Sequence, residues 1–149
     1  MSLYETINDE IKKAMLARDK VKLDTVRGIK KEFLEAKTAK GGDGELSDEV
    51  AIKILNKMAK QRKESAEIFI QQNRKDLADE ELAQLAVVEL YLPKQLSEAE
   101  VEAELKVIIA ETGASSAKEM GKVMGVASKR LNGKADGKLI SEIVKKLLA

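Results

Sequence analysis

Glycines and lysines share one face of a helix predicted near the C-terminus of the chain. Because successive helical residues turn by about 100°, four of them fall within roughly 60° of one another: Lys118, Lys122, Gly125 and Lys129. A glycine inside a helix costs about 1 kcal/mol relative to alanine, and these glycines face away from the apolar stripe. The pattern indicates close approach of a ligand to the helix backbone, and the surrounding ammonium groups suit a polyanion.

The loop after this helix continues the pattern, because Gly133 to Lys138 carries two more lysines before the next helix. Backbone N–H groups at the start of that helix, near Asp136, can donate to an anion. The segment contains no aromatic residue, so base stacking is excluded and recognition of the shape and backbone of a folded RNA is predicted. The residues expected to contact RNA are Lys118, Gly121, Lys122, Gly125, Lys129, Lys134, Gly137 and Lys138.

The same segment is also compatible with two roles that involve no RNA. In one, the lysines are simply solvated and the glycines accommodate packing against the N-terminal half of the chain. In the other, the basic segment docks on an acidic protein surface, and the chain is a protein-interaction adaptor.

The net charge of +1 hides an uneven distribution. Residues 114–149 contain eight basic and three acidic residues, a net charge of +5. Residues 41–113 contain nine basic and sixteen acidic residues, a net charge of −7, and the first 40 residues carry +3. A basic end attached to an acidic middle can bind a polyanion locally without the whole protein attracting one.

The composition excludes several kinds of active site. With no cysteine and no histidine, the chain has no disulfide, no thiol nucleophile, no Cys/His zinc site and no Ser/His/Asp triad. The carboxylates of the acidic middle are typical of solvated helix faces, and none is singled out as an acid or a base. We therefore expect no catalytic residue, no metal ligand and no cofactor.

No targeting or membrane signal is visible in the sequence. The chain starts without a charged region followed by an apolar run, and no stretch approaches the roughly 18 apolar residues of a membrane span. We accordingly expect a cytoplasmic protein with no membrane partner.

The low aromatic content of 3% and the abundance of Ala, Leu, Glu and Lys favour an all-α fold. About seven helices are expected, four before the single proline and three after it. This proline, Pro93, marks the boundary between two small helical domains. They are an N-terminal four-helix domain, residues 1–93, and a C-terminal three-helix domain, residues 94–149.

Capping signals place several helix starts. Three pairs have the spacing of a capping box, Ser2 with Glu5, Ser97 with Glu100 and Ser116 with Glu119, and Asp136 is expected to cap the last helix. Further predictions are a second helix over 19–40 before the Gly41 to Gly44 break, a third from Ser47 whose inward stripe includes Ile68, and a fourth over 79–90.

An arginine interrupts the inward line of the third helix. Arg62 lies among apolar positions, and a guanidinium there must be paired. Glu89 is the expected partner in a buried interhelical ion pair, with a ligand-binding role for Arg62 as the alternative. Arg74 and Asp76, two residues apart, are expected to brace a turn between helices.

The ordered motifs also resemble a known family. Met120 to Gly125, followed by Gly133 to Gly137 and an apolar helix, is similar to the tail domain shared by the YqeY family and the B subunit of glutamine-dependent tRNA amidotransferases (GatB). Further matches are Arg62 to Ser65 with Phe69, then Arg74, Asp76 and Leu77, then Tyr91, Leu92, Pro93, Gln95 and Leu96. Because the matches cover most of the chain from about Arg27 onward, the chain is identified as a free-standing YqeY-like protein.

The resemblance implies a substrate class. In the GatB-like amidotransferases the similar tail is implicated in gripping tRNA, while other domains carry the glutaminase and ATP-dependent transfer chemistry. The implied partners are tRNA or tRNA-like RNA, together with amidotransferase or aminoacyl-tRNA synthetase proteins. We expect a non-enzymatic accessory protein of aminoacyl-tRNA amidation. The alternative that the family implies is carbon–nitrogen ligase activity with glutamine as the amido-nitrogen donor.

Overall fold

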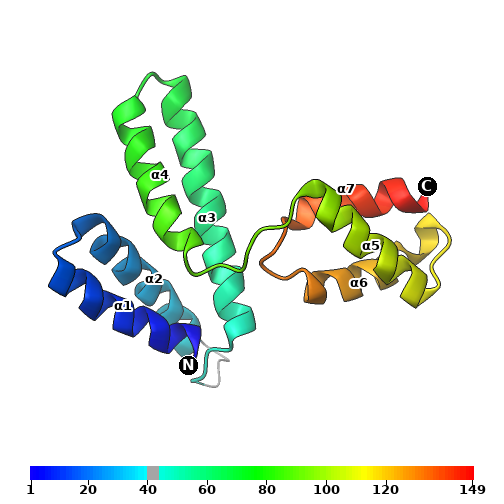
Figure 1. Ribbon diagram of the computed structural model, residues 1–149, viewed down its shortest axis with the longest axis horizontal. Helices are drawn as coiled ribbons and strands as arrows, with labels where there is room; N and C mark the ends of the chain where they lie inside the picture. Colours follow the sequence, from blue (N-terminus) through cyan, green and yellow to red (C-terminus); the bar gives the residue numbers. More distant parts are fainter. Residues whose placement is uncertain (40–43) are drawn as a thin grey trace. The chain divides into compact units, whose positions relative to one another are not determined.

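The computed structural model describes residues 1–39 and 44–149, and the regular elements within these ranges are all helical (Figure 1). The described elements are α1 (Leu3–Ala17), α2 (Lys20–Thr38), α3 (Asp48–Gln71), α4 (Lys75–Glu89), α5 (Glu98–Thr112), the short 3₁₀ helix η1 (Ala117–Glu119), α6 (Met120–Arg130) and α7 (Gly137–Leu148). The all-α prediction is confirmed. The predicted end of the second helix at Lys40 and most of the predicted glycine break, Gly41 to Asp43, lie outside the described residues.

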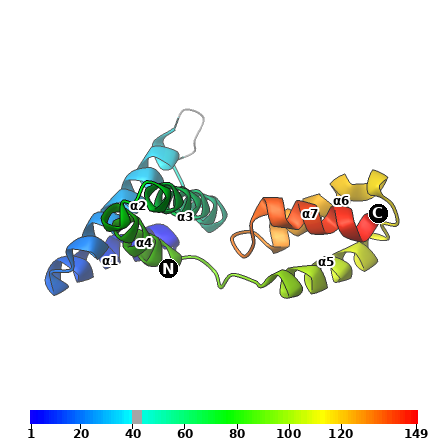
Figure 2. The ribbon, with the colours of Figure 1, turned by 90° about the horizontal axis from the view of Figure 1, so that it is seen from above.

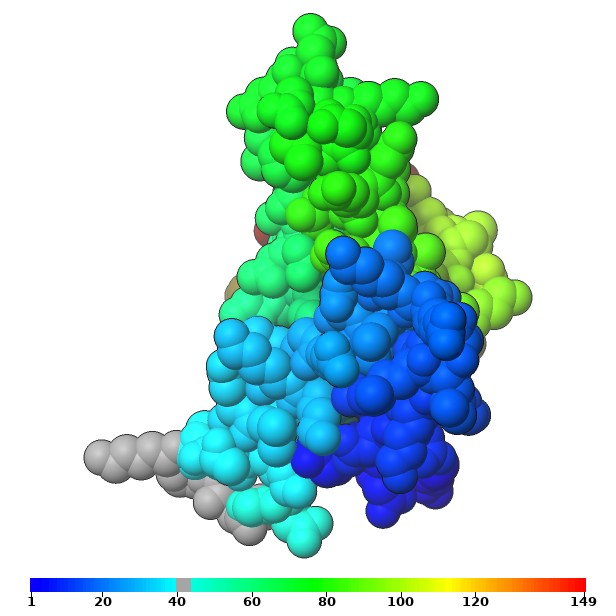
Figure 3. Space-filling model, turned by 90° about the vertical axis from the view of Figure 1, so that its left-hand side faces the viewer, coloured from blue at the N-terminus to red at the C-terminus, as the bar shows by residue number. Residues whose placement is uncertain are grey.

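The chain divides into two compact units, Met1–Leu92 and Pro93–Ala149, which we describe separately. That these units are the two predicted domains, residues 1–93 and 94–149, stays a prediction. In the first unit, α3 and α4 form a long helical hairpin, and α1 and α2 pack across one end of it (Figures 1 and 3). Their apolar stripes meet in a core of Ile7, Ile29, Phe33, Ala51, Leu55, Met58, Ala59, Leu85 and Val88.

The other end of the hairpin extends beyond α1 and α2, and in Figure 3 it is the green tip above the blue helices. Ile68 lies there, in the last turn of α3, and 51% of its surface is exposed. The prediction that Ile68 points into the core is therefore wrong, because the core reaches only the first half of α3.

The turn at this tip is braced as expected. The Arg74 guanidinium donates two hydrogen bonds to the Asp76 carboxylate, at 3.2 and 3.1 Å. This contact lowers the pKa of Asp76 below its ordinary value. Helix α4 begins at Lys75, four residues before the predicted start, and it begins without a side-chain cap.

Two of the three predicted capping boxes are present. The Ser2 hydroxyl accepts the Glu5 N–H at 3.2 Å, and the Ser97 hydroxyl accepts the Glu100 N–H at 3.2 Å. In both boxes the glutamate side chain accepts the N–H of the capping serine. Asp136 caps α7 as predicted. Local sequence therefore determines where α1, α5 and α7 begin.

The third predicted box is wrong. Ser116 makes no side-chain cap, and the Glu119 carboxylate instead accepts the Ser115 N–H at 2.7 Å. The chain makes the 3₁₀ helix η1 before α6 begins at Met120. Lys118 therefore lies on η1 and does not continue the α6 face.

In the second unit, α5, α6 and α7 all contact one another (Figure 2). The core uses one face of each helix: Val101, Leu105 and Ile108 from α5, Val123 and Ala127 from α6, and Ile140, Ile143, Val144 and Leu148 from α7. Gly113 ends α5 in the left-handed conformation, with φ of 71°. The core uses the opposite side of α6 from Gly121 and Gly125, so the glycine face is left outside it.

Within the described ranges, no helix is both long and apolar enough to cross a bilayer. The same residues contain no group of three or more acidic side chains placed to hold a metal ion.

Candidate functional site

The exposed face of α6 carries an open hollow of about 500 Å³. Two neighbouring rows of residues line it, and the residues in each row are four positions apart along the helix. The first row is Gly121, Gly125 and Lys129, and the second is Lys122, Val126 and Arg130. Each row ends in a cation at the C-terminal end of α6, where positive charge also interacts favourably with the helix dipole.

The hollow exists because two side chains are missing. Gly121 and Gly125 are both exposed, and a Cβ built on either would meet no described atom within 4 Å other than the backbone of α6 itself. Within residues 93–149, no neighbour packs closely enough to require a glycine at these positions. Within this unit the backbone at both glycines is exposed, as the sequence pattern predicted, and that a ligand approaches there stays a prediction.

The cations around the hollow differ in their surroundings. Lys122 and Lys129 are exposed. Arg130 is about half exposed and forms an ion pair with Glu111 of α5. The hydrogen bond from Arg130 to Glu111 raises the pKa of Arg130 above its ordinary value.

The remaining predicted contact residues do not line this hollow. Lys134, Gly137 and Lys138 are exposed on the loop after α6 and on the first turn of α7. The Asp136 carboxylate already accepts the Lys138 N–H, at 3.3 Å. An anion at the start of α7 would therefore compete with Asp136, which weakens the expected role of these backbone groups.

Part of the family motif has a structural role. The Gln95 side chain donates to the Gly133 carbonyl, and the Leu96 N–H donates to the Lys134 carbonyl at 2.8 Å. Gly133 is buried with φ of 76°, a conformation that side chains disfavour. Gln95, Leu96 and Gly133 thus hold the loop between α6 and α7 in place.

The predicted ion pair of Arg62 has a different partner. Arg62 Nη1 lies 3.2 Å from Glu81 Oε2, and Glu89 is exposed near the end of α4. Arg62 is also partly exposed rather than buried, with 36% of its side chain accessible. Because Arg62 lies in the second half of α3, it faces the first half of α4, and Glu89 is two turns too far along the hairpin.

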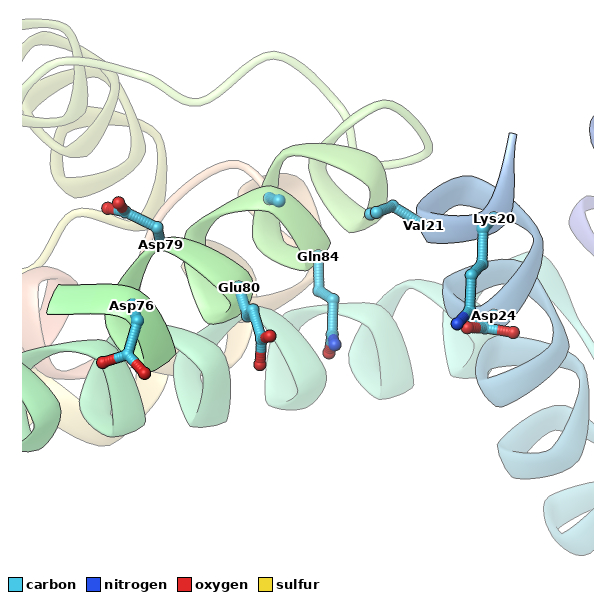
Figure 4. Close-up of a pocket in the computed structure, with 8 residues that line it drawn as sticks. Lys20, Val21, Asp24, Asp76, Asp79, Glu80 and Gln84 are labelled. Carbon is cyan, nitrogen blue, oxygen red and sulfur yellow. The ribbon is translucent and has the colours of Figure 1, made fainter. Parts of the chain in front are cut away.

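A second hollow lies between α2 and α4, and the charged residues that line it are mostly acidic (Figure 4). Asp76, Asp79 and Glu80 project from α4, and Asp24 with Lys20 comes from α2. Three of the four carboxylates belong to the acidic middle of the sequence. This hollow does not suit an anion, so the α6 hollow is the candidate for a polyanion.

Sequence reasoning missed Arg130 and Val126 in the α6 hollow. The signal was present, since both follow Lys122 at intervals of four residues. What concealed Arg130 was its place on the helical projection, where it lies about 20° from the buried Val123. Only the packing of α5 beside α6 shows that Arg130 has a carboxylate partner.

Several yeast proteins are similar to this chain. The protein named altered inheritance of mitochondria protein 41, mitochondrial, is 33% identical over 112 residues in Lachancea thermotolerans, an alignment that spans 70% of this chain and 57% of the relative. The proteins of the same name from Meyerozyma guilliermondii and Kluyveromyces lactis are 38% and 31% identical, over 58% and 57% of this chain and 44% and 45% of the relatives. The chain thus spans about half the length of the curated relatives it matches.

The names of these relatives bear on the expected location of the protein and not on its expected RNA, activity or partners. The relatives are named as mitochondrial proteins, which contradicts the cytoplasmic location expected from the absence of a targeting signal. Their names state no RNA, enzyme activity or partner. The model of the family described as "Yqey-like protein" matches residues 4–148, nearly the whole sequence. The chain belongs to the YqeY family.

Proposed function

We propose that this YqeY-family protein binds tRNA or a similarly folded RNA through the α6 hollow and acts without catalysing a reaction. The supporting observation is the pair of open glycines, Gly121 and Gly125, with Lys122 and Lys129 beside them. A phosphodiester strand can approach the helix backbone at the glycines, and the ammonium groups neutralise its phosphates. Contacts of this kind position an RNA and read its shape, and they do not read its sequence.

The proposal also includes protein partners, namely enzymes that act on the same RNA. The resemblance to the amidotransferase tail suggests an accessory role beside an amidotransferase or an aminoacyl-tRNA synthetase. Lys134 and Lys138 would then extend the contact beyond the hollow, because both are exposed on the same unit. Lys118, on η1 immediately before α6, would do the same on the other side.

A salt series tests this proposal. The purified protein, residues 1–149, is titrated with total tRNA on filters between about 50 and 250 mM salt. The logarithm of the affinity should fall by about 0.7–0.9 for each phosphate contact per unit log salt. Replacing both Lys122 and Lys129 by Gln should weaken binding and reduce that slope by about 1.4–1.8, because two contacts are lost.

The matched control removes two lysines elsewhere in the same unit. Lys145 and Lys146 are exposed in the last turn of α7, as Lys129 is in the last turn of α6. The double change of Lys145 and Lys146 to Gln alters net charge equally and should leave the slope near the wild-type value. Equal losses from both pairs would show unspecific attraction between charges and would remove the support for the hollow.

The adaptor function is the alternative, because a row of Gly121 and Gly125 also lets a helix of another protein approach closely. RNA binding that is absent or insensitive to salt would favour this alternative. Ligase activity with glutamine as nitrogen donor is the second alternative, and ammonia release from glutamine above the buffer background would support it.

A further inference from the structure

The ion pair between Arg130 and Glu111 lies at the edge of the α6 hollow. Arg130 lines the hollow, and its guanidinium is held by Glu111 of α5. Both side chains are about half exposed, so the pair is accessible to a ligand in the hollow. A guanidinium matches a phosphate in geometry and charge as well as it matches a carboxylate.

We propose that Arg130 is a third phosphate-binding cation of the α6 hollow and that Glu111 restrains it, so that RNA binding exchanges the Glu111 carboxylate for an RNA phosphate. This inference rests on the proposed RNA-binding function and adds the residue that tunes it. The free hollow then presents the exposed Lys122 and Lys129 beside an Arg130 that is already paired with Glu111.

The balance of energies permits this exchange. An exposed ion pair is weak in water, so giving it up opposes binding only slightly. A phosphodiester strand already held by two lysines is attracted to the same guanidinium at short range. Glu111 thereby lowers the affinity for isolated anions and weakly held strands, while a strand that reaches all three cations still binds.

The test compares single and double variants of the chain, residues 1–149, in the same salt series with total tRNA. Glu111→Gln should tighten binding by about two- to fivefold, the factor that corresponds to one exposed ion pair. Arg130→Gln should weaken binding and reduce the salt slope by about 0.7–0.9, the value for one phosphate contact. In the Arg130→Gln background, Glu111→Gln should have no further effect.

The chain offers a matched control on the same helix. Glu102 of α5 pairs with Lys106, at 3.6 Å, and neither residue lines the hollow. Glu102→Gln changes net charge by the same amount as Glu111→Gln and should leave the affinity unchanged. Glu104 would be a poorer control, because its charge also acts on Arg130.

Three results would overturn the inference. They are an affinity of Glu111→Gln equal to or below wild type, an equal gain from Glu102→Gln, and a gain from Glu111→Gln that persists without Arg130. If the Lys122 and Lys129 double variant loses binding while Glu111→Gln has no effect, the inference fails and the proposed function stands. If the wild-type chain binds no RNA, both fail together. Circular dichroism and thermal melting of each variant identify any that do not fold.

Discussion

Replacing Gly125 by alanine should stabilise the protein and weaken its binding to RNA. Gly125 lies in the middle of α6, and a glycine there costs about 1 kcal/mol of helix stability relative to alanine. A methyl group at this position meets no described atom within 4 Å, so no packing penalty offsets the gain. The same methyl group occupies the hollow in which we place the RNA backbone.

The size of the expected shift in melting midpoint depends on how much of the chain unfolds in one transition. A gain of about 1 kcal/mol raises the melting midpoint by about 4–8 °C if residues 93–149 unfold in a transition of their own. The shift is about 2–4 °C if all 149 residues unfold together. Thermal denaturation followed by circular dichroism measures the midpoint, and the filter assay measures the affinity for tRNA.

Gly28 provides the matched control, because it also lies inside a helix, α2, and a Cβ there meets no described atom within 4 Å. Gly28→Ala should stabilise the first unit by a similar amount and leave RNA binding unchanged. A lower melting midpoint for Gly125→Ala would refute the claim that its backbone is open. A higher midpoint with unchanged RNA affinity would refute the claim that the RNA approaches there.

Two further predictions concern the first unit. Glu81→Gln should lower the free energy of unfolding, measured in urea, by about 1 kcal/mol, because Arg62 loses its partner. Glu89→Gln should change the free energy of unfolding by less than about 0.5 kcal/mol. Equal effects of the two changes would contradict the pairing with Glu81. Burial, together with the nearby Glu10 carboxylate, raises the pKa of Tyr91 to about 12, from an ordinary value of 10. The folded state therefore holds the phenol proton more tightly than the unfolded state, and stability falls as the pH rises from about 10 to about 12. Tyr91→Phe should remove that part of the alkaline loss in urea denaturation at a series of pH values, and an unchanged loss would show that Tyr91 does not contribute to it.

The sequence alone determined the fold class and the helix starts that depend on local hydrogen bonds. The capping boxes at Ser2 and Ser97 formed because both partners lie within one turn. The pair Ser116 and Glu119 has the same spacing and did not form a box, since Ser115 supplied a competing N–H to the glutamate. Spacing shows that a cap is possible, and the local backbone path decides whether it forms.

The composition of the α6 face was also readable from the sequence, because residues four apart on a helix are neighbours whatever the rest of the fold does. The sequence could not show which carboxylate meets which arginine, since Arg62 with Glu81 and Arg130 with Glu111 are each nineteen residues apart. Those pairings depend on the register in which two helices pack. Nor could it show that no neighbour in residues 93–149 covers Gly121 and Gly125, because that depends on how α5, α6 and α7 pack.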